Sequence, residues 1–415
     1  MEKSSIQEKL YLYLFSFIPL SIVLGPSISL ANILIIDLIF LVNLFFIKNF
    51  KLETKYEITL FFIIYLYLIC NSFISISFQE GALRNFGFLR FIIIFCTINY
   101  FFHTSKNTDR IFNIWSITIF IVVLDSIIEF TFGKNLLGYG DQLYSNRIVS
   151  FFKDEPIVGG YLLGFVFIVS GFYFDKFINK SLKYKLILTF IILVLFGCIL
   201  ITGERSNGIK AIIGLTLFIF LNKNIKFNSK IFLLFLSIII SSLIIFNSSY
   251  LKIRYGQQLF TQIFDKNQRE KFIENNIYLK LYKSGFAIFK DHPIFGVGNK
   301  NYRVITTQNI ETKANDQYML NTHPHQIYIE LLSEHGLVGS LILLSIFFTL
   351  IFKNLKIIIL SRNSVQLGCL IYLIINFLPI LPSGSFFNDF SLTLFWLNLS
   401  ILYACNKQTN IFSKY

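Results

Sequence analysis

Long apolar runs recur along the whole chain and are separated by short polar segments. A helix needs about 20 mostly apolar residues to cross a hydrocarbon core of roughly 30 Å, so such runs predict transmembrane helices. The runs lie at 10–24, 27–48, 58–77, 86–102, 111–130, 157–174, 186–202, 209–221, 231–247, 338–352, 365–381 and 391–405. We therefore expect an all-α, polytopic integral membrane protein, with about twelve transmembrane helices in a single membrane domain over 1–415.

The placement of charge refines this picture. Only 14% of the residues are charged and 54% are hydrophobic, whereas soluble globular proteins carry roughly 25% charged residues. The net charge is +14, and much of it lies in alternate Lys-rich connections, which typically face the cytoplasm. These connections are 48–55, 103–110, 175–185, 222–230 and 353–363. Both termini are then cytoplasmic and membrane lipid surrounds the chain, and we expect no nucleic-acid partner.

The other connections are expected on the outward side of the membrane. The longest, 248–337, is too polar to span and long enough to hold several helices. Within it, 270–289 has apolar residues at near-helical spacing, which predicts an amphipathic helix on the membrane face. Gly336 and Gly339 then let the chain turn into the next span.

Three of the five histidines lie in the stretch "NTHPHQIYIELLSEHGLVGS", residues 321–340. Pro324 suits the first position of a helix, which would place His325 in the first helical turn. Free backbone N–H groups and a positive dipole end there would suit an anion such as phosphate. They would also keep His325 neutral and able to accept a proton. The alternative is that His323 and His325 are ordinary polar residues at the membrane interface.

Arginines and one carboxylate gather in the same set of outward connections. Arg205, in "TGERSNG", lies in a short connection between two predicted spans. An arginine beside the hydrocarbon is energetically unfavourable unless it is paired or functional. Its planar fork suits bidentate phosphate binding, although it could also snorkel to the headgroups beside Glu204. Arg147, Arg303 and Glu155 are expected on the same side.

Cofactor chemistry finds little support in the sequence. No Walker loop or dinucleotide fingerprint occurs. A His-x-His pair can bind zinc, but no third ligand follows at a familiar spacing, so we predict no metal and no cofactor. Without a nucleotide site, an outward-facing reaction has to use a substrate that is already activated.

The histidine stretch also resembles a known family. "HPHQIYIELLSEHGLVG" is similar to the His-Asn-x-x-Leu…Glu-x-Gly-x-x-Gly signature of the O-antigen ligase and polymerase superfamily. "FKDEPIVGGYL", "TGERS", "DHPIFGVGNKNYR" and "LPSGSFFNDF" resemble other blocks of that group in the same order, so the resemblance covers 140–390. The chain departs from the pattern at Gln326 and Ile329, where the family usually has Asn and Leu.

The resemblance implies a metal-independent, inverting membrane glycosyltransferase at the periplasmic face of the bacterial inner membrane. Its donor would be an undecaprenyl-diphosphate-linked glycan. The acceptor would be lipid A–core for a ligase, or a growing glycan for a polymerase. His325 would be the catalytic base, with Glu155 as the alternative.

The remaining candidates would bind substrate: Arg205 most directly, then Arg147, Arg303 and His323. A transporter is the rival class, either a lipid-linked sugar flippase or a polysaccharide exporter. Transporters often place polar residues at mid-membrane depth and contain repeated, broken helices. The polar residues of this chain crowd into outward connections and its spans show no repeat, which favours an enzyme.

Overall fold

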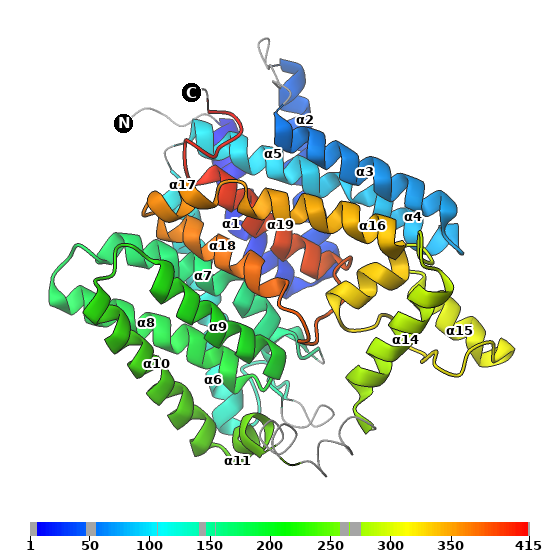
Figure 1. Ribbon diagram of the computed structural model, residues 1–415. Helices are drawn as coiled ribbons and strands as arrows, with labels where there is room; N and C mark the ends of the chain where they lie inside the picture. Colours follow the sequence, from blue (N-terminus) through cyan, green and yellow to red (C-terminus); the bar gives the residue numbers. More distant parts are fainter. Residues whose placement is uncertain are drawn as a thin grey trace.

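The computed structural model consists of helices joined by loops (Figure 1). It describes residues 6–46, 55–105, 107–140, 147–153, 155–257, 265 and 275–413. No strand occurs among these residues, so the predicted all-α class is confirmed. Nine helices in the described part are long and apolar enough to cross a membrane. The chain is therefore a polytopic membrane protein, and the exact number of spans stays a prediction.

Within the described residues, a helix covers most of each predicted apolar run. These helices are α1 (Ile6–Leu24), α2 (Pro26–Phe46), α3 (Tyr56–Ile74), α5 (Leu89–Thr104), α6 (Thr108–Phe132), α7 (Val158–Phe177), α8 (Leu182–Ile201), α9 (Arg205–Leu221), α10 (Phe227–Asn247), α16 (Ile327–Phe352), α18 (Ser364–Asn376) and α19 (Asp389–Ala404). The shorter elements are α4 (Phe78–Gly87), η1 (Ser150–Phe152), α11 (Ser249–Leu251), η2 (Lys252–Gln257), α14 (Ile277–Asp291), α15 (Tyr302–Thr312) and α17 (Leu355–Leu360). Of the amphipathic stretch predicted at 270–289, residues from Ile277 onward form α14, and most of its beginning lies outside the described residues.

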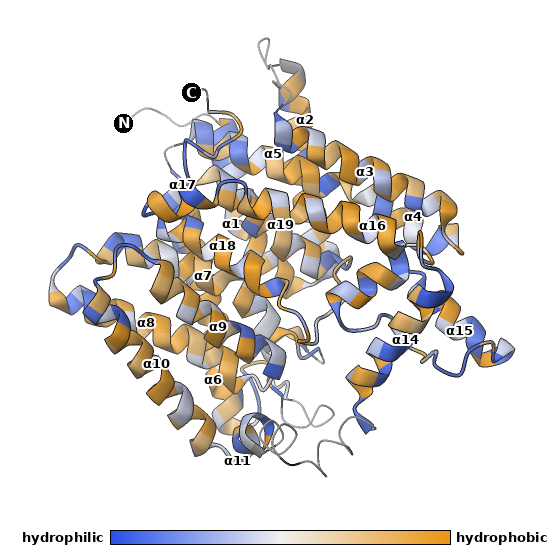
Figure 2. Cartoon of the chain, viewed as in Figure 1, coloured by the Kyte–Doolittle hydropathy of each residue, from blue (hydrophilic) through white to orange (hydrophobic). Residues whose placement is uncertain are grey.

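Small residues hold the centre of the bundle together. A Cβ on Gly171 would lie 2.3 Å from the carbonyl oxygen of Ser364, and one on Gly368 would lie 2.4 Å from that of Phe167. Helices α7 and α18 therefore touch along their backbones, as small residues allow in membrane bundles. By contrast, α10 buries none of its residues, and its surface is largely apolar (Figure 2). Such a helix suits contact with lipid.

The loops gather at two ends of the bundle. The described parts of the Lys-rich loops lie with the start of α1 and residues 405–413. The hydrogen bonds that join them are Lys55–Ser413, Ser105–Glu8, Asn224–Arg362, Ser364–Asp175 and Asn363–Cys405. The other loops meet through Ser77–Asn301, Ile148–Thr202, Arg84–Asp389, Ser206–Pro382 and Ser383–His325. The two sets inferred from charge are thus separate in space; which compartment each end faces stays a prediction.

Helix α16 is broken at Gly336, which has φ 62° and ψ −168°. The 292–301 loop crosses the break and forms hydrogen bonds with the exposed backbone on both sides. Val297 N–H donates to the Ser333 carbonyl at 3.0 Å, and Leu337 N–H donates to the Pro293 carbonyl at 2.8 Å. The chain therefore turns at Gly336, as predicted. The backbone of the 292–301 loop provides hydrogen-bond partners for the helix N–H and C=O groups that lose theirs at the break.

Replacing Gly336 by alanine tests the importance of this contact. A Cβ there would lie 2.4 Å from the Ile294 backbone, so Gly336→Ala should lower the unfolding temperature of the purified protein strongly. Gly133→Ala is the matched control, because Gly133 also has a positive φ, 77°, but has open space around it. In the control, the free energy of unfolding should fall by only about 1–2 kcal/mol, which is the penalty for an alanine in the left-handed conformation. Equal losses in thermal melts of the two variants would contradict the backbone contact.

Candidate active site

A buried lysine stands where the 292–301 loop leaves the break in α16. Lys300 is 5% exposed and has φ 62°, a left-handed conformation that non-glycine residues adopt only when their surroundings hold them there. Its two neighbours are anchored to α3 and the turn after it. Asn299 N–H donates to the Asn71 side chain at 2.9 Å, and the Asn301 side chain accepts from Ser77 N–H at 2.7 Å. These two anchors fix the direction of the lysine side chain.

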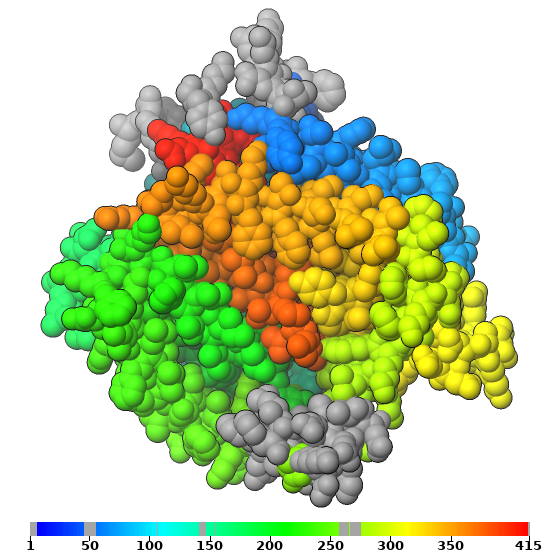
Figure 3. Space-filling view, in the orientation of Figure 1, coloured from blue at the N-terminus to red at the C-terminus, as the bar shows by residue number. Residues whose placement is uncertain are grey.

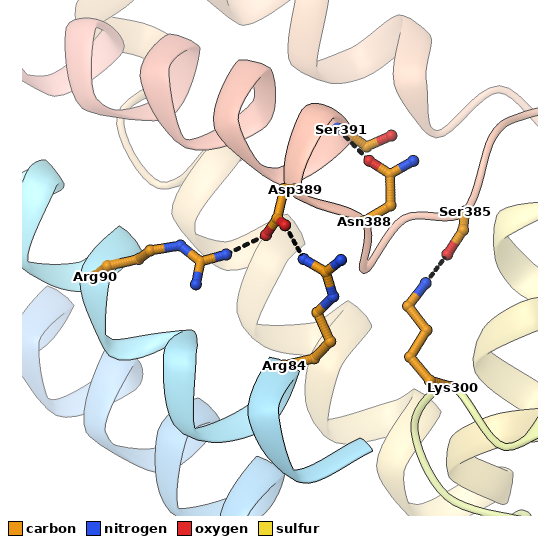
Figure 4. A network of polar contacts seen from close by, with 7 residues as sticks. All are labelled: Arg84, Arg90, Lys300, Ser385, Asn388, Asp389 and Ser391. Carbon is orange, nitrogen blue, oxygen red and sulfur yellow. Dashed lines mark hydrogen bonds and ion pairs between the residues drawn. The ribbon is translucent and has the colours of Figure 1, made fainter. Parts of the chain in front are cut away.

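Lys300 points into a pair of buried glutamates on α16. Its Nζ donates to Ser385 (Figure 4), and the Ser385 hydroxyl donates to Glu330 at 2.5 Å. Phe386 N–H donates to the other Glu330 oxygen at 2.9 Å. Glu334, one turn further along, is also fully buried and lies within electrostatic range of Lys300 and Glu330. A buried charge is tolerated only when it is paired and hydrogen-bonded, so the single charge of Lys300 can balance one of the two carboxylates.

The 377–388 loop links this hydrogen-bond network to His325. Ser383 N–H donates to the His325 carbonyl at 2.8 Å, two residues before the Ser385 that joins Lys300 to Glu330. The same loop accepts a hydrogen bond from Ser206 through the Pro382 carbonyl, at 2.5 Å. One loop therefore contacts both His325 and the first turn of α9, which begins at Arg205.

The predicted start of the histidine helix is wrong. Helix α16 begins at Ile327, and Gln326 is its N-cap, whose side-chain oxygen accepts from Ile329 N–H at 2.8 Å. Pro324 is thus not the first helical residue, and His325 lies just before the cap with φ 58°. The cap already satisfies one of the N–H groups that we expected to be free for an anion. His325 remains next to the helix end but outside its first turn.

The two histidines face each other, with ring centroids 3.9 Å apart. Burial lowers the pKa of His323 to about 3, and its Nε2 is buried without a partner among the described residues. Burial also lowers the pKa of His325, although an interaction of its imidazole with the Ser383 backbone opposes the shift. Both imidazoles are therefore neutral near neutral pH. The expected neutral state holds, but burial causes it rather than the helix dipole.

A cluster of arginines lies beside the histidines. Arg205 is within electrostatic range of Arg147 and Arg254 and also of Tyr278, whose ring packs edge-on against His325 at 5.7 Å. The Nε atoms of Arg147 and Arg254 are buried without a partner in the described part of the chain. Like charges gathered in this way favour a bound anion. Arg254, in η2, was missed because no local pattern distinguishes it from other loop arginines.

Glu204 does not neutralise this cluster by pairing with Arg205. Its carboxylate accepts from Gly159 N–H and from the Asn207 side chain, each at 2.6 Å. Burial raises the pKa of Glu204 to about 7, against the effect of the Arg147 charge. Around neutral pH this carboxyl is partly protonated, so it provides less than one full negative charge.

The other two candidates lie apart from Arg205. Arg303, the second residue of α15, has a buried Nε without a partner among the described residues and acts electrostatically on His323. Glu155 is exposed and lines a separate cavity whose lining includes neither His325 nor Arg205. The structure thus brings Arg147 and Arg205 together, places Arg303 near the histidines, and sets Glu155 elsewhere.

The surface is hollowed between α9 and α14, next to the 377–388 loop (Figure 3). Arg205, Tyr278 and the histidines belong to the segments around this hollow. The arrangement combines neutral imidazoles, which can accept a proton, with arginine guanidinium groups, which can bind an anion. It suits a reaction in which a hydroxyl loses a proton while a negatively charged group departs.

Comparison with known proteins adds an independent observation. Residues 190–344 match the family described as O-antigen ligase. No curated protein matches the chain. The matched segment includes Arg205, Arg254, Lys300 and His325, and Glu155 lies outside it. The match of residues 190–344 supports the resemblance of the chain to the O-antigen ligase and polymerase superfamily.

Proposed function

We propose that the protein transfers a glycan from an undecaprenyl-diphosphate donor to an acceptor hydroxyl. The family supports glycan transfer in O-antigen biosynthesis. The donor and the reaction are proposed from the cationic cluster of Arg205, Arg147 and Arg254. Tyr278 lies between this cluster and neutral His325, since it is near Arg205 and its ring packs against the imidazole. Arginine forks bind diphosphate oxygens well, and a neutral imidazole accepts the acceptor's proton.

The reaction needs no further co-reactant. The acceptor oxygen bonds to the anomeric carbon on the face opposite the diphosphate, while the bond from that carbon to the diphosphate oxygen breaks with inversion. The acceptor proton passes to His325, and the electron pair leaves on the diphosphate. The arginines stabilise this growing charge and so act mainly in the transition state. No metal ion takes part in this scheme.

His325 is the proposed base because burial favours its neutral form, while the Ser383 hydrogen bond fixes its backbone. His323 and Arg303 would orient substrate beside it. Glu155 remains the alternative base on chemical grounds, although it lines another cavity. The acceptor would be lipid A–core in a ligase or a growing glycan in a polymerase.

The Lys-rich end would face the cytoplasm with both termini, and the site would face the periplasm from the inner membrane. The alternation of basic loops supports this orientation. The membrane domain would be one unit over 1–415, and 248–337 would form its large periplasmic loop. The family-like region over 140–390 includes every site residue named above.

Substitution of the histidines should separate the candidate bases. His325→Ala should reduce glycan transfer by about 10²–10⁴-fold, the usual cost of losing a general base. His323→Ala should reduce it less, and Glu155→Gln should leave the chemical step nearly unchanged. The measurement is the single-turnover rate of purified variants at matched protein level. Near-normal transfer by His325→Ala together with loss in Glu155→Gln would move the base to Glu155.

Arg205→Lys tests whether the guanidinium binds diphosphate. Lysine keeps the charge but loses the bidentate fork. Loss of one charge-assisted hydrogen bond, roughly 1.5–3 kcal/mol, should slow turnover about ten- to a hundredfold at saturating donor. Arg110→Lys is the control, because Arg110 is exposed at the Lys-rich end. If the turnover rate of Arg205→Lys stays within about twofold of the wild-type rate, the Arg205 guanidinium does not bind diphosphate in the transition state.

The pH dependence follows from the direction of the histidine shift. The base works only when neutral, and burial lowers the pKa of His325 below its ordinary value of 6.5. Transfer should therefore hold as the pH falls to 6.5 and decline only at lower pH, as His325 takes up a proton. A pH–rate profile of the wild type checks this. A decline that begins above 6.5 would exclude His325 as the titrating base.

A further inference from the structure

A cavity that is not lined by His325 lies at the Asn388 end of the 377–388 loop. Its volume is about 640 Å³, within the range usual for small-molecule sites. The α1–α2 turn forms an apolar wall that includes Leu24 and Ile28, which are 53% and 41% exposed. The other wall is polar and comes from α4, the start of α5, the residues that follow η1 and the start of α19. It includes Arg84, Arg90, Lys153, Glu155 and Asp389.

An ion-pair network organises the polar wall. Asp389 binds Arg84 with one carboxylate oxygen and Arg90 with the other (Figure 4). Each guanidinium has five N–H donors, so one shared carboxylate leaves most of them for other partners. The side chains remain partly accessible, 35% for Arg84 and 31% for Asp389. Lys153, in the same wall, is held at φ 61°, a conformation that often marks functional sites.

The wall suits a ligand that both donates and accepts hydrogen bonds. A bare anion would meet Glu155 and Asp389 as like charges, and a bare cation would meet three basic groups. Sugar hydroxyls bind carboxylates as donors and guanidinium groups as acceptors. Aromatic rings of Phe151, Phe152 and Phe390 also line the cavity, as is usual for sites that bind partly apolar molecules.

The cavity and the histidine site share one loop. Ser383 and Pro382 contact His325 and Ser206 on one side, whereas Asn388 and Asp389, at its end, line the cavity. Transfer between two lipid-borne molecules requires a binding place for each of them. The cavity provides the second place, from which the reacting hydroxyl of an extended saccharide has to reach around the loop to His325.

We propose that this cavity binds the saccharide of a lipid-linked acceptor, with the apolar chain of that lipid along the α1–α2 turn. The proposal rests on the glycan transfer proposed above and adds the acceptor's place and chemical class. It also gives Glu155 a role in holding a sugar hydroxyl rather than in removing the reacting proton.

Photolabelling with a lipid-like sugar tests the proposal directly. The probe is decyl maltoside with a diazirine in its alkyl chain, added to the full-length protein in nanodiscs and mapped by mass spectrometry. We expect labelling of residues 22–33 in the wild type, lost in Ser27→Trp, which fills the cavity from an exposed position on its rim. Thr131→Trp, exposed at the end of α6 and absent from the cavity lining, should keep the labelling.

Two further arms make the test decisive. Arg84→Gln should weaken labelling roughly tenfold through one lost charge-assisted hydrogen bond. A decanol probe with the same diazirine should label 22–33 much more weakly than the maltoside. Equal labelling by decanol, or unchanged labelling in Ser27→Trp, would show a general lipid groove and overturn the saccharide site.

The outcome is separable from failure of the proposed function. His325→Ala should keep wild-type labelling while losing transfer. In transfer assays, Ser27→Trp should raise the acceptor concentration needed for half-maximal rate and leave that of the donor unchanged. If the wild type makes no glycosidic bond yet labelling follows the pattern above, the proposed function fails and the saccharide site stands. If transfer is normal in Ser27→Trp at every acceptor concentration, the acceptor site is wrong.

Discussion

A helix in a membrane has to satisfy its own backbone hydrogen bonds, and α16 gives up several of them at Gly336. The 292–301 loop supplies the missing partners by lying across the break, with Gly296 and Gly336 in direct backbone contact. Buried backbone groups without partners cost several kcal/mol each, so loop and helix are expected to order together. The loop then projects Lys300 to Ser385, which also donates to Glu330. These contacts hold the 377–388 loop, which in turn contacts the His325 backbone through Ser383.

Charged side chains near the histidines form two groups, one around Lys300 and one around Arg205. The acids nearest the histidines, Glu330 and Glu334, are buried beside Lys300, which balances one of their two charges within the protein. Around Arg205 three arginines have, among the described residues, only the carboxyl group of Glu204 close by, which interacts with Arg147 and accepts its hydrogen bonds from backbone and amide donors. The first region is suited to fixing geometry. The second is suited to an anionic substrate, which completes the charge balance when it binds.

The sequence predicted the helices well, because the length and apolarity of a span are local properties. It also predicted the break at Gly336 and the grouping of the loops at two ends. It failed at the start of α16, since the Gln326 cap and the Ser383 contact with His325 depend on side chains and loops distant in sequence. It missed Lys300 and Arg254 for the same reason: only the folded chain shows which cations are buried and which face the hollow. Tertiary contacts also bury Glu330 and Glu334, which no local pattern predicts for two charged residues of a helix.

The central claim is that this membrane protein forms a glycosidic bond unaided. The most direct measurement reconstitutes the purified chain in liposomes with an undecaprenyl-diphosphate glycan and rough lipopolysaccharide, in chelator and without nucleotide, and analyses the product by mass spectrometry and NMR. The account predicts glycan joined to a new hydroxyl with inverted anomeric configuration, together with released undecaprenyl diphosphate. Movement of the lipid-linked glycan across the bilayer with no new bond, on either this acceptor or a second donor molecule, would contradict it and identify a transporter.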